Sequence, residues 1–245
     1  MNSTIKSDLK ISGSGSAAGG SYNDVVVNGE GRINGDIDCL EFKTNGVSNV
    51  SGNIKANTFK VNGTSTVKGD VNSGELRVNG HSDIQGNVEG KEMKIDGTTN
   101  ISGAVSVEEI QIRGVAKVEG DCNAEIFVAK GAFTIDGLLN AGDISIDMHG
   151  TCKAKEIGGE KINVKKAAAS RLKDIIKSFF VSFNLEDGLC SEIIEGDDIY
   201  LEYTRAQVVR GNNVTIGTGC KIGLVEYKGN FEQLDNGIVS ESKKL

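Results

Sequence analysis

One short phrase recurs through the first two thirds of the sequence, and it recurs at a fixed interval. Aligned on its first large apolar residue, the phrase begins again at every seventeenth position. Self-similarity at one fixed period is the signature of a repeat architecture, so it is interpreted before any local motif. The aligned residues are Val25, Phe42, Phe59, Leu76, Met93, Ile110, Phe127 and Ile144.

Each repeat carries three pairs of apolar or small residues separated by glycine. Counting the Phe59 position as zero, the pairs fall at positions zero and two, six and eight, and twelve and fourteen, with glycine at four and ten. Alternation with a period of two is strand periodicity. Hairpins are excluded because every unit runs in the same direction. The pattern predicts an all-β fold in which each unit is one coil of a parallel β-helix with a triangular cross-section.

The corners carry glycine and short polar residues. Glycine is expected there to supply backbone conformations that a residue with a Cβ reaches only at a cost, and Asn-Gly is a strong turn signal. Outward Asn and Asp after the position-ten glycines suggest calcium as an alternative, but the glycine-rich calcium repeat of other β-helices is absent. A stacked turn ladder is therefore favoured. These residues are Asn28, Asn45, Asn62 and Asn79 at one corner and Asp36, Asn53, Asp70 and Asn87 at another.

Composition agrees with a rod made mostly of paired strands. The 245 residues include 33 Gly and no Pro, and Pro would remove a ladder donor from an internal strand. The net charge of −7 argues against nucleic-acid binding, which needs a basic surface. There is neither a signal peptide nor an apolar run long enough to span a bilayer.

The sequence offers no catalytic, cofactor-binding or metal-binding residue. His81 and His149 have no Ser, Cys or Asp partner at a suggestive spacing, and both are expected to be exposed corner residues. The cysteines are odd in number and lack CxxC spacing, which favours buried structural thiols over disulfides or zinc ligands. They are Cys39, Cys122, Cys152, Cys190 and Cys220.

The repeat divides the chain into five segments. Residues 1–8 are expected to be a loose tail, 9–164 the main coils, 165–190 an insertion, 191–228 further coils, and 229–245 a disordered polar tail. The rod is expected to hold about ten coils of ~17 residues each.

Two places in the main coils depart from the repeat. The first coil is thin, and Leu9 precedes Val25 by one residue less than the repeat period. A flexible linker over residues 9–24 is therefore the alternative interpretation. The phase slips again at Asp147–Gly150, which predicts a bulged corner, and Ile162 follows Ile144 by one residue more than the period.

The insertion breaks the strand pattern with an amphipathic helical stripe beside basic residues. One interpretation is a segment packed over the β-helix. The other is a contact surface for anionic lipid or a protein partner, because a basic face with large apolar residues is typical of interfacial helices. The stripe is Leu172, Ile175, Ile176, Phe179, Phe180 and Phe183, and the basic residues include Arg171, Lys173 and Lys177.

The block from Ile193 to Tyr227 returns to strand periodicity and is expected to add about two coils. Its register is set by Ile216, which lies one full repeat period after Ile199. The residues expected to point inward are Ile199, Leu201, Ala206, Val208, Val214, Ile216, Cys220 and Ile222.

Three sequence elements together resemble the bactofilin family of bacterial, polymer-forming cytoskeletal proteins. They are the repeated xIxGxxxVxGxV coil, the N-terminal LKISGSGSAAGG, and the block IEGDDIYLEYTRAQVVRGNNVTIGTGCKIGLVEY, and they cover most of residues 9–227. The chain looks like a longer, Firmicute-type member. The resemblance implies a right-handed β-helix that assembles end to end into filaments without nucleotide. It also implies a homopolymer in the cytoplasm, at the inner face of the cell membrane, which scaffolds cell shape, envelope or motility processes.

The two ends of the rod are the predicted assembly surfaces. The first and last coils would expose unpaired backbone groups, and open strand edges are templates for pairing with another chain. Head-to-head and head-to-tail joining both remain open. The expected interface is Leu9 and Ile11 at one end and Val214, Ile216, Ile222, Val225 and Tyr227 at the other.

Two other classes of protein remain as alternatives. One is a non-polymerising regulator similar to the β-helical domains of cell-division inhibitors, which assembly state would separate from a filament. The other is an acyltransferase, because NVTIGTGCKIG resembles the hexapeptide coils of those enzymes. They need a longer coil period and a catalytic His on a projecting loop, and this chain offers neither. An enzyme is therefore not expected.

Overall fold

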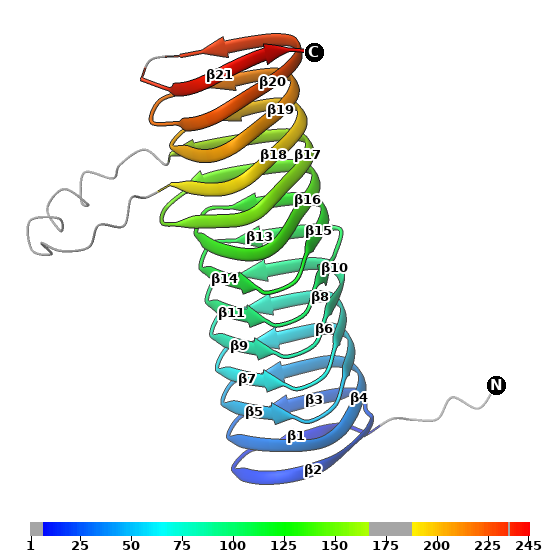
Figure 1. The fold of residues 1–245 in the computed structure, drawn as a ribbon. Coiled ribbons are helices and arrows are strands. Elements are labelled where there is room, and N and C mark those ends of the chain that lie inside the picture. Colours follow the sequence, from blue (N-terminus) through cyan, green and yellow to red (C-terminus); the bar gives the residue numbers. More distant parts are fainter. Residues whose placement is uncertain (1–6, 167–187, 235) are drawn as a thin grey trace, which may run out of the picture.

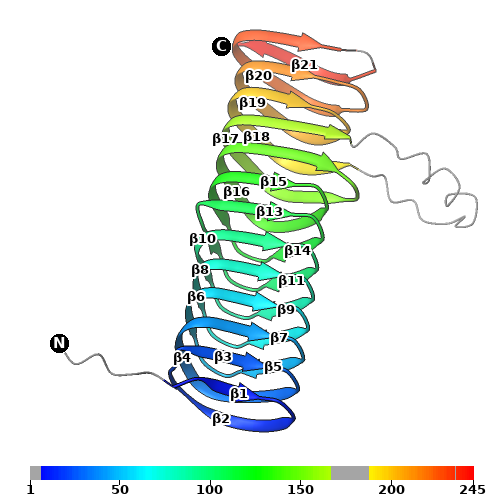
Figure 2. The same cartoon turned by 180° about the vertical axis from the view of Figure 1, so that it is seen from behind.

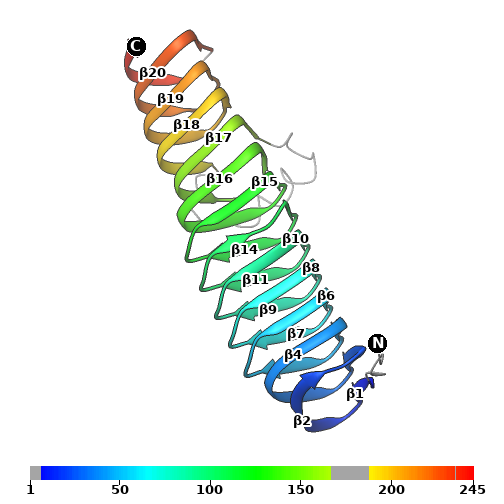
Figure 3. The same cartoon turned by 90° about the vertical axis from the view of Figure 1, so that its right-hand side faces the viewer.

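The computed structural model describes residues 7–166, 188–234 and 236–245, and these form one elongated parallel β-helix (Figure 1). The coils stack in chain order along the rod, as the views from behind and from the side also show (Figures 2 and 3). The described residues form strands and no helix. The strands make about 13 turns, which is more than the ten expected, and at about 4.8 Å per turn the rod is on the order of 60 Å long.

The strands fall into two groups along the rod. In the N-terminal group most coils are divided into short strands by glycine corners, whereas from the middle onward one long strand runs through most of a coil (Figure 3). The first group is β1 (Leu9–Ile11), β2 (Ser14–Ser21), β3 (Asp24–Val27), β4 (Glu30–Thr44), β5 (Val47–Val50), β6 (Ile54–Val61), β7 (Thr64–Val67), β8 (Val71–Val78), β9 (His81–Ile84), β10 (Val88–Ile95), β11 (Thr98–Ile101), β12 (Val105–Ser106), β13 (Glu109–Ile112), β14 (Val115–Val118) and β15 (Cys122–Ala129). The second group is β16 (Ala132–Met148), β17 (Cys152–Lys166), β18 (Leu189–Leu201), β19 (Thr204–Ile216), β20 (Lys221–Gln233) and β21 (Ile238–Lys244).

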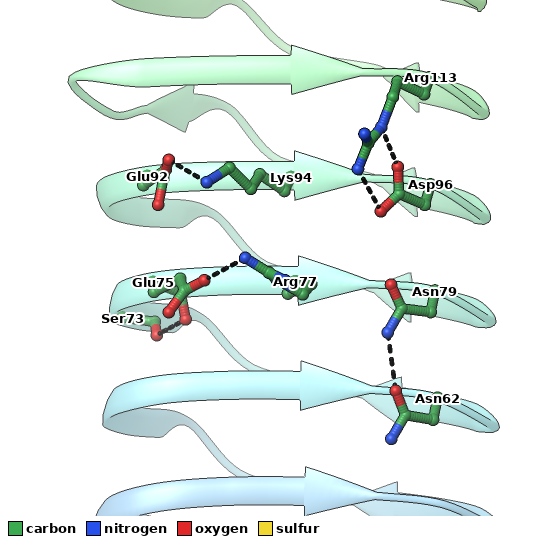
Figure 4. Close-up of polar contacts among 9 residues, drawn as sticks. All are labelled: Asn62, Ser73, Glu75, Arg77, Asn79, Glu92, Lys94, Asp96 and Arg113. Atoms are coloured by element: carbon green, nitrogen blue, oxygen red, sulfur yellow. Dashed lines mark hydrogen bonds and ion pairs between the residues drawn. The ribbon is translucent and has the colours of Figure 1, made fainter.

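Three faces build each coil, and all strand pairs are parallel. One coil shows them: Thr58–Val61 lies on the first face, Thr64–Val67 on the second and Val71–Ser73 on the third. Phe59 pairs with Phe42 below it and Leu76 above it, each one repeat period away. The burial pattern alternates along each face, which confirms the predicted inward pairs. The superhelix is right-handed, since the near strands in Figure 4 run left to right while the chain climbs.

The core is narrow and arranged in columns. Phe42 and Phe59 stack between adjacent coils with ring centroids 5.4 Å apart, whereas Phe127 and Phe133 meet edge to face at 5.3 Å within one coil. A hydroxyl column runs along the second face, where Ser48 donates to Ser65 at 2.9 Å. Inward side chains therefore meet others of their own kind in the coils above and below, as in any in-register stack.

The corner glycines are required for a reason different from the one expected. Among the described glycines only three have a positive φ, so unusual backbone conformation does not explain the others. At Gly63, a Cβ would lie closer than 3.0 Å to the carbonyl oxygen of Gly46 in the preceding coil. Glycine is needed because adjacent corners approach one another closely. The same clash would arise at Gly46, Gly80, Gly97, Gly114 and Gly131.

The thin first coil exists, and the slip in the middle occurs where it was predicted. Leu9 pairs with Val25 through β1 and β3 in the shortened register, which excludes a free linker over these residues. Ile144 pairs with Ile162, and a second register shift follows Ile135 in the same strand pair.

The predicted register of the C-terminal coils was wrong. Ile199 pairs with Val214, and Leu201 pairs with Ile216. The ladder contact between Asp198 and Asn213 accordingly joins side chains 15 residues apart, whereas the N-terminal ladder contact between Asn45 and Asn62 spans 17 residues. One inward assignment was also wrong, because Val209 is buried and Val208 is not.

The C-terminal tail is not disordered, because β20 extends to Gln233 and β21 pairs with it along residues 238–244. Even the last residue is held, since the Leu245 N–H donates to the Tyr227 carbonyl at 2.8 Å. The expected polar tail is thus the final coil of the rod.

Changing a corner glycine to alanine should be costly only where a coil lies beneath it. We expect Gly63→Ala to lower the free energy of unfolding by about 1–3 kcal/mol, as overpacking does in well-packed interiors. Gly13 occupies the same corner in the first coil, where a Cβ would meet nothing within 4 Å. Gly13→Ala is the matched control and should leave the denaturation midpoint unchanged; equal losses would refute the close-approach explanation.

Candidate functional site

The N-terminal end of the rod is an open and thin-walled coil. β1 pairs only with β3, and β2 pairs only with β4, so within the described ranges the outer edge of both strands has no strand partner. Leu9 is half-buried and Ile11 is buried, while β2 consists of Ser, Gly and Ala only. This end therefore offers backbone donors and acceptors with few side chains in the way.

The C-terminal end is also open, and it gathers apolar side chains. Among the residues that the structure describes, β21 has a strand partner on one side only, namely β20. Three of the seven exposed large hydrophobic residues in the described chain belong to this last coil: Leu234, Ile238 and Leu245 are 37%, 58% and 54% exposed. Phe231 belongs to the same coil and packs on Tyr227 with ring centroids 5.4 Å apart. We call Phe231, Leu234, Ile238, Val239 and Leu245 the terminal apolar cluster.

The structure places some of the residues predicted for assembly in a terminal coil and others inside the rod. Leu9 and Ile11 do lie in the first coil. At the other end, the predicted residues lie one or two coils inside: β20 covers Val214 and Ile216, and β21 covers Ile222 and Val225. Tyr227 is half-buried under Lys244, whose Nζ is 5.9 Å from the ring centroid. The terminal apolar cluster was missed because the last coil was assigned to a tail.

The flanks are closed by ladders of polar side chains. Asn45 donates to Asn28, Asn62 to Asn45 and Asn79 to Asn62, each at 2.7 Å, and Figure 4 shows the last of these steps. Above them Arg113 forms an ion pair with Asp96 one coil below. The ladder links side chains of successive coils along the flank, where the backbone of each described coil is already paired with the next.

The second corner forms the predicted stacked turn ladder. The Oδ1 atom of Asp36 accepts the Asn53 N–H at 2.8 Å, and Asn53 and Asp70 repeat the contact one coil higher each time. In the described ranges no group of three or more His, Cys, Asp or Glu is placed to hold a metal ion.

The two histidines lie on the outer surface. His149 is an exposed corner residue, as expected. His81 instead lies on β9, and its Nε2 is 3.0 Å from Asp83 Oδ2, a partner two residues away that the sequence reading overlooked. Both side chains are about two-fifths exposed, so the pair lies on a flat strand surface rather than in a cleft.

Comparison with known proteins identifies the N-terminal part of the chain. The bactofilin family model, described as polymer-forming cytoskeletal, matches residues 2–89. Residues 2–89 are a bactofilin domain. The chain is also similar to two proteins of Bacillus subtilis strain 168, both described as uncharacterized. YhbF is 40% identical over 109 residues, and YhbE is 38% identical over 111 residues.

The similarity covers part of each protein. It spans 44% of this chain and 42–43% of the two relatives, so the chain spans less than half the length of the relatives it matches. No solved structure matches. Along the rod, the bactofilin domain includes the open first coil and ends at β10, whereas the terminal apolar cluster lies beyond it.

The predicted contact surface of the insertion lies outside the described residues, as Leu172, Ile175, Ile176, Phe179, Phe180, Phe183, Arg171, Lys173 and Lys177 fall within residues 167–187. Within the described ranges no helix is long and apolar enough to cross a membrane.

The chain enters this segment from a fixed point on the rod. The Lys166 N–H donates to Glu202 Oε2 at 3.1 Å, and Lys166 Nζ lies 4.4 Å from the Tyr203 ring centroid. Tyr200 donates to Glu202 at 2.6 Å, which raises the pKa of Tyr200 to about 12.

Four of the five cysteines are buried, as predicted, and all five are reduced thiols. Burial raises the pKa of Cys122 to about 12 and that of Cys152 to about 11, because the thiolate would lose its hydration. Cys190 differs, since it is only half-buried on the outer side of β18.

A thiol reagent should therefore distinguish Cys190 from the other cysteines. At pH 8 the raised pKa values keep Cys122 and Cys152 protonated, and thiols react as thiolates. We expect one thiol per chain to react rapidly with Ellman's reagent in the native protein and all five to react in denaturant. Cys190→Ser should abolish the rapid phase, and a remaining rapid phase would show that the buried column is accessible.

Proposed function

We propose that this protein is a nucleotide-independent, self-polymerising cytoskeletal scaffold whose rods join end to end. The observation that carries the proposal is the contrast between flanks and ends. The flanks pair with themselves coil after coil, while both terminal coils leave a strand edge open and the last one holds the terminal apolar cluster. The polymer-forming description of the bactofilin domain supports the same function.

The physical argument rests on how β-structures protect their edges. Repeat proteins usually end in polar capping units, and exposed apolar edges are templates for pairing with another chain. The first coil of this rod carries only Gly, Ala and Ser along β2, and the last exposes large apolar side chains. Identical ends that meet give closed pairs, and unlike ends that meet give an open filament. Joining at both ends propagates a filament in either arrangement.

Charge placed at the C-terminal end should block assembly without unfolding the rod. Leu234→Lys and Ile238→Lys change side chains that are already exposed, so we expect stability to change by about 0.5 kcal/mol or less. Burying an unpaired ammonium between two ends is costly, so the concentration needed for assembly should rise about tenfold or more. Sedimentation measures the concentration at which the protein assembles, and negative-stain electron microscopy shows whether filaments form.

The flank provides a matched control for the same change. Leu40 is 53% exposed but lies on the side of the rod, so Leu40→Lys should assemble like the native protein. Unchanged filaments with lysine at Leu234 and Ile238 would refute assembly through the terminal apolar cluster. Charge at Ile11 or Val225 is a poorer test, because both side chains are buried and the fold itself would suffer.

A non-polymerising β-helical regulator is the alternative function, and a monodisperse native protein at micromolar concentration would favour it. For either function we propose a cytoplasmic location, at the inner face of the cell membrane, with membrane lipid or envelope proteins as further partners in cell shape, envelope or motility processes. The support is the apolar and basic composition of residues 171–183.

The lipid contact has its own test. The native protein should co-sediment with vesicles that contain anionic lipid, and Phe179→Ser with Phe180→Ser should reduce the bound fraction severalfold because less apolar area is buried. Leu40→Ser, the same kind of change on the flank of the rod, is the control. Equal binding by the serine variant would exclude these two side chains as the contact.

A further inference from the structure

The first face of the rod carries two columns of opposite charge that run side by side. In the first seven coils, the outward residue just before the inward position zero is acidic in six, and the outward residue just after it is basic in five. In these coils neither column contains a residue of the opposite charge. We call these columns the charge stripe. The acidic column is Asp8, Asp24, Glu41, Glu75, Glu92 and Glu109, and the basic column is Lys10, Lys43, Lys60, Arg77 and Lys94.

The strand register places like charges directly above one another. Lys43 pairs with Lys60, Lys60 with Arg77, and Arg77 with Lys94. In the acidic column, which Thr58 interrupts, the like-charged pairs are Asp24 with Glu41, Glu75 with Glu92, and Glu92 with Glu109. Like charges directly opposite each other on paired strands are destabilising. If the order of acid and base alternated from coil to coil, each strand would keep its ion pair and avoid this repulsion. The stability of a single rod therefore does not explain the segregation.

The stripe lies on the outer surface and is held in shape by pairs within each strand. Arg77 Nη2 is 2.9 Å from Glu75 Oε1, and Lys94 Nζ is 2.5 Å from Glu92 Oε1 (Figure 4). These four side chains are 23–37% exposed. Each carboxylate thus keeps an open side toward solvent, where a second cation can approach without rearrangement of the rod.

Symmetry decides which partner fits this surface. If two rods face each other through the stripe and run in the same direction, a two-fold axis along the rods places each acidic column against the basic column of the other copy. If the rods run in opposite directions about an axis across the face, acid meets acid and base meets base. Because both rods repeat at the same coil spacing of about 4.8 Å, all charge pairs of the parallel arrangement come into register together.

We propose that a second copy of this chain binds side by side along the charge stripe, with both rods pointing in the same direction. The surface is self-complementary only in that arrangement, so it selects relative polarity as well as a partner. The charge stripe ends at the eighth coil, where the acidic and basic positions are occupied by Ile126 and Val128. In the tenth coil Lys161 stands at the acidic position. This lateral contact is distinct from the ends that carry the proposed polymerisation. The lateral contact can be measured in the Leu234→Lys, Ile238→Lys background, where joining through the C-terminal end is blocked.

Exchanging acidic and basic residues tests whether charge pairing between the two rods holds the lateral contact together. Lys43→Glu, Arg77→Glu and Lys94→Glu together make the stripe acidic in those three coils, and we expect lateral association in sedimentation velocity to weaken at least roughly tenfold. Adding Glu41→Lys, Glu75→Lys and Glu92→Lys exchanges acid and base within those three coils and restores the native net charge. This six-residue variant should pair with itself as the native protein does. Failure of the exchange to restore pairing in a folded rod would overturn the proposal, as would native association of the acidic variant.

Cross-linking tests the direction of the rods and needs no change of charge. Val26 and Gln111 are neutral members of the basic column in the second and seventh coils, about 24 Å apart along the rod. Val26→Cys and Gln111→Cys are introduced separately, each into a Cys190→Ser background, and the two proteins are cross-linked alone and as a mixture. The reagent is a bismaleimide that spans roughly 10 Å or slightly more, the distance between two packed sheets. Parallel pairing predicts that each variant cross-links to itself and not to the other. Cross-linking of Val26→Cys to Gln111→Cys, or no cross-link in either, would overturn the proposal.

Discussion

The interaction on which this structure depends is the backbone pairing of each coil with the next through corners that have no room for a side chain. At Gly63 and its equivalents the backbone of one coil lies against the carbonyl of the coil below. This approach keeps three strands per coil in register over the whole N-terminal group. One added methyl group at such a corner separates two coils locally, and the pairing on both adjoining faces is affected.

The same stacking explains why side chains of one kind gather in columns. Because successive coils are in register, each position of the repeat becomes a line along the rod. Asparagine at one position becomes an amide ladder, and serine at another becomes a hydroxyl column inside the core. Acid and base at two outward positions become the charge stripe. A short sequence repeat therefore produces long, regular surfaces along the rod, and these surfaces run between the first and the last coil.

The first and last coils differ in chemistry, and this affects how the ends can join. The N-terminal coil is thin and offers mainly backbone, whereas the C-terminal coil offers Phe231, Leu234 and Ile238. Between them the coil period shortens and the strands lengthen. The bactofilin domain at residues 2–89 lies wholly in the N-terminal group. The C-terminal coils therefore form a second surface, with its own geometry, on the same rod.

The repeat by itself determined the parallel β-helix and its inward positions in the regular coils, because a constant period leaves little freedom in register. The first coil was left open between a weak coil and a flexible linker, and the pairing of Leu9 with Val25 decided it. Tertiary structure decided where the rod ends. In the last coil three inward positions carry the polar residues Gln233, Ser242 and Lys244, beside Phe231 and Val239 at two others. Nothing lies above them to bury, so the apolar alternation that reveals a strand is lost there and the segment reads as a polar tail. The shorter C-terminal register was hidden for a related reason: inward residues occur at both Ile199 and Leu201, and only strand pairing shows which of them lies below Ile216.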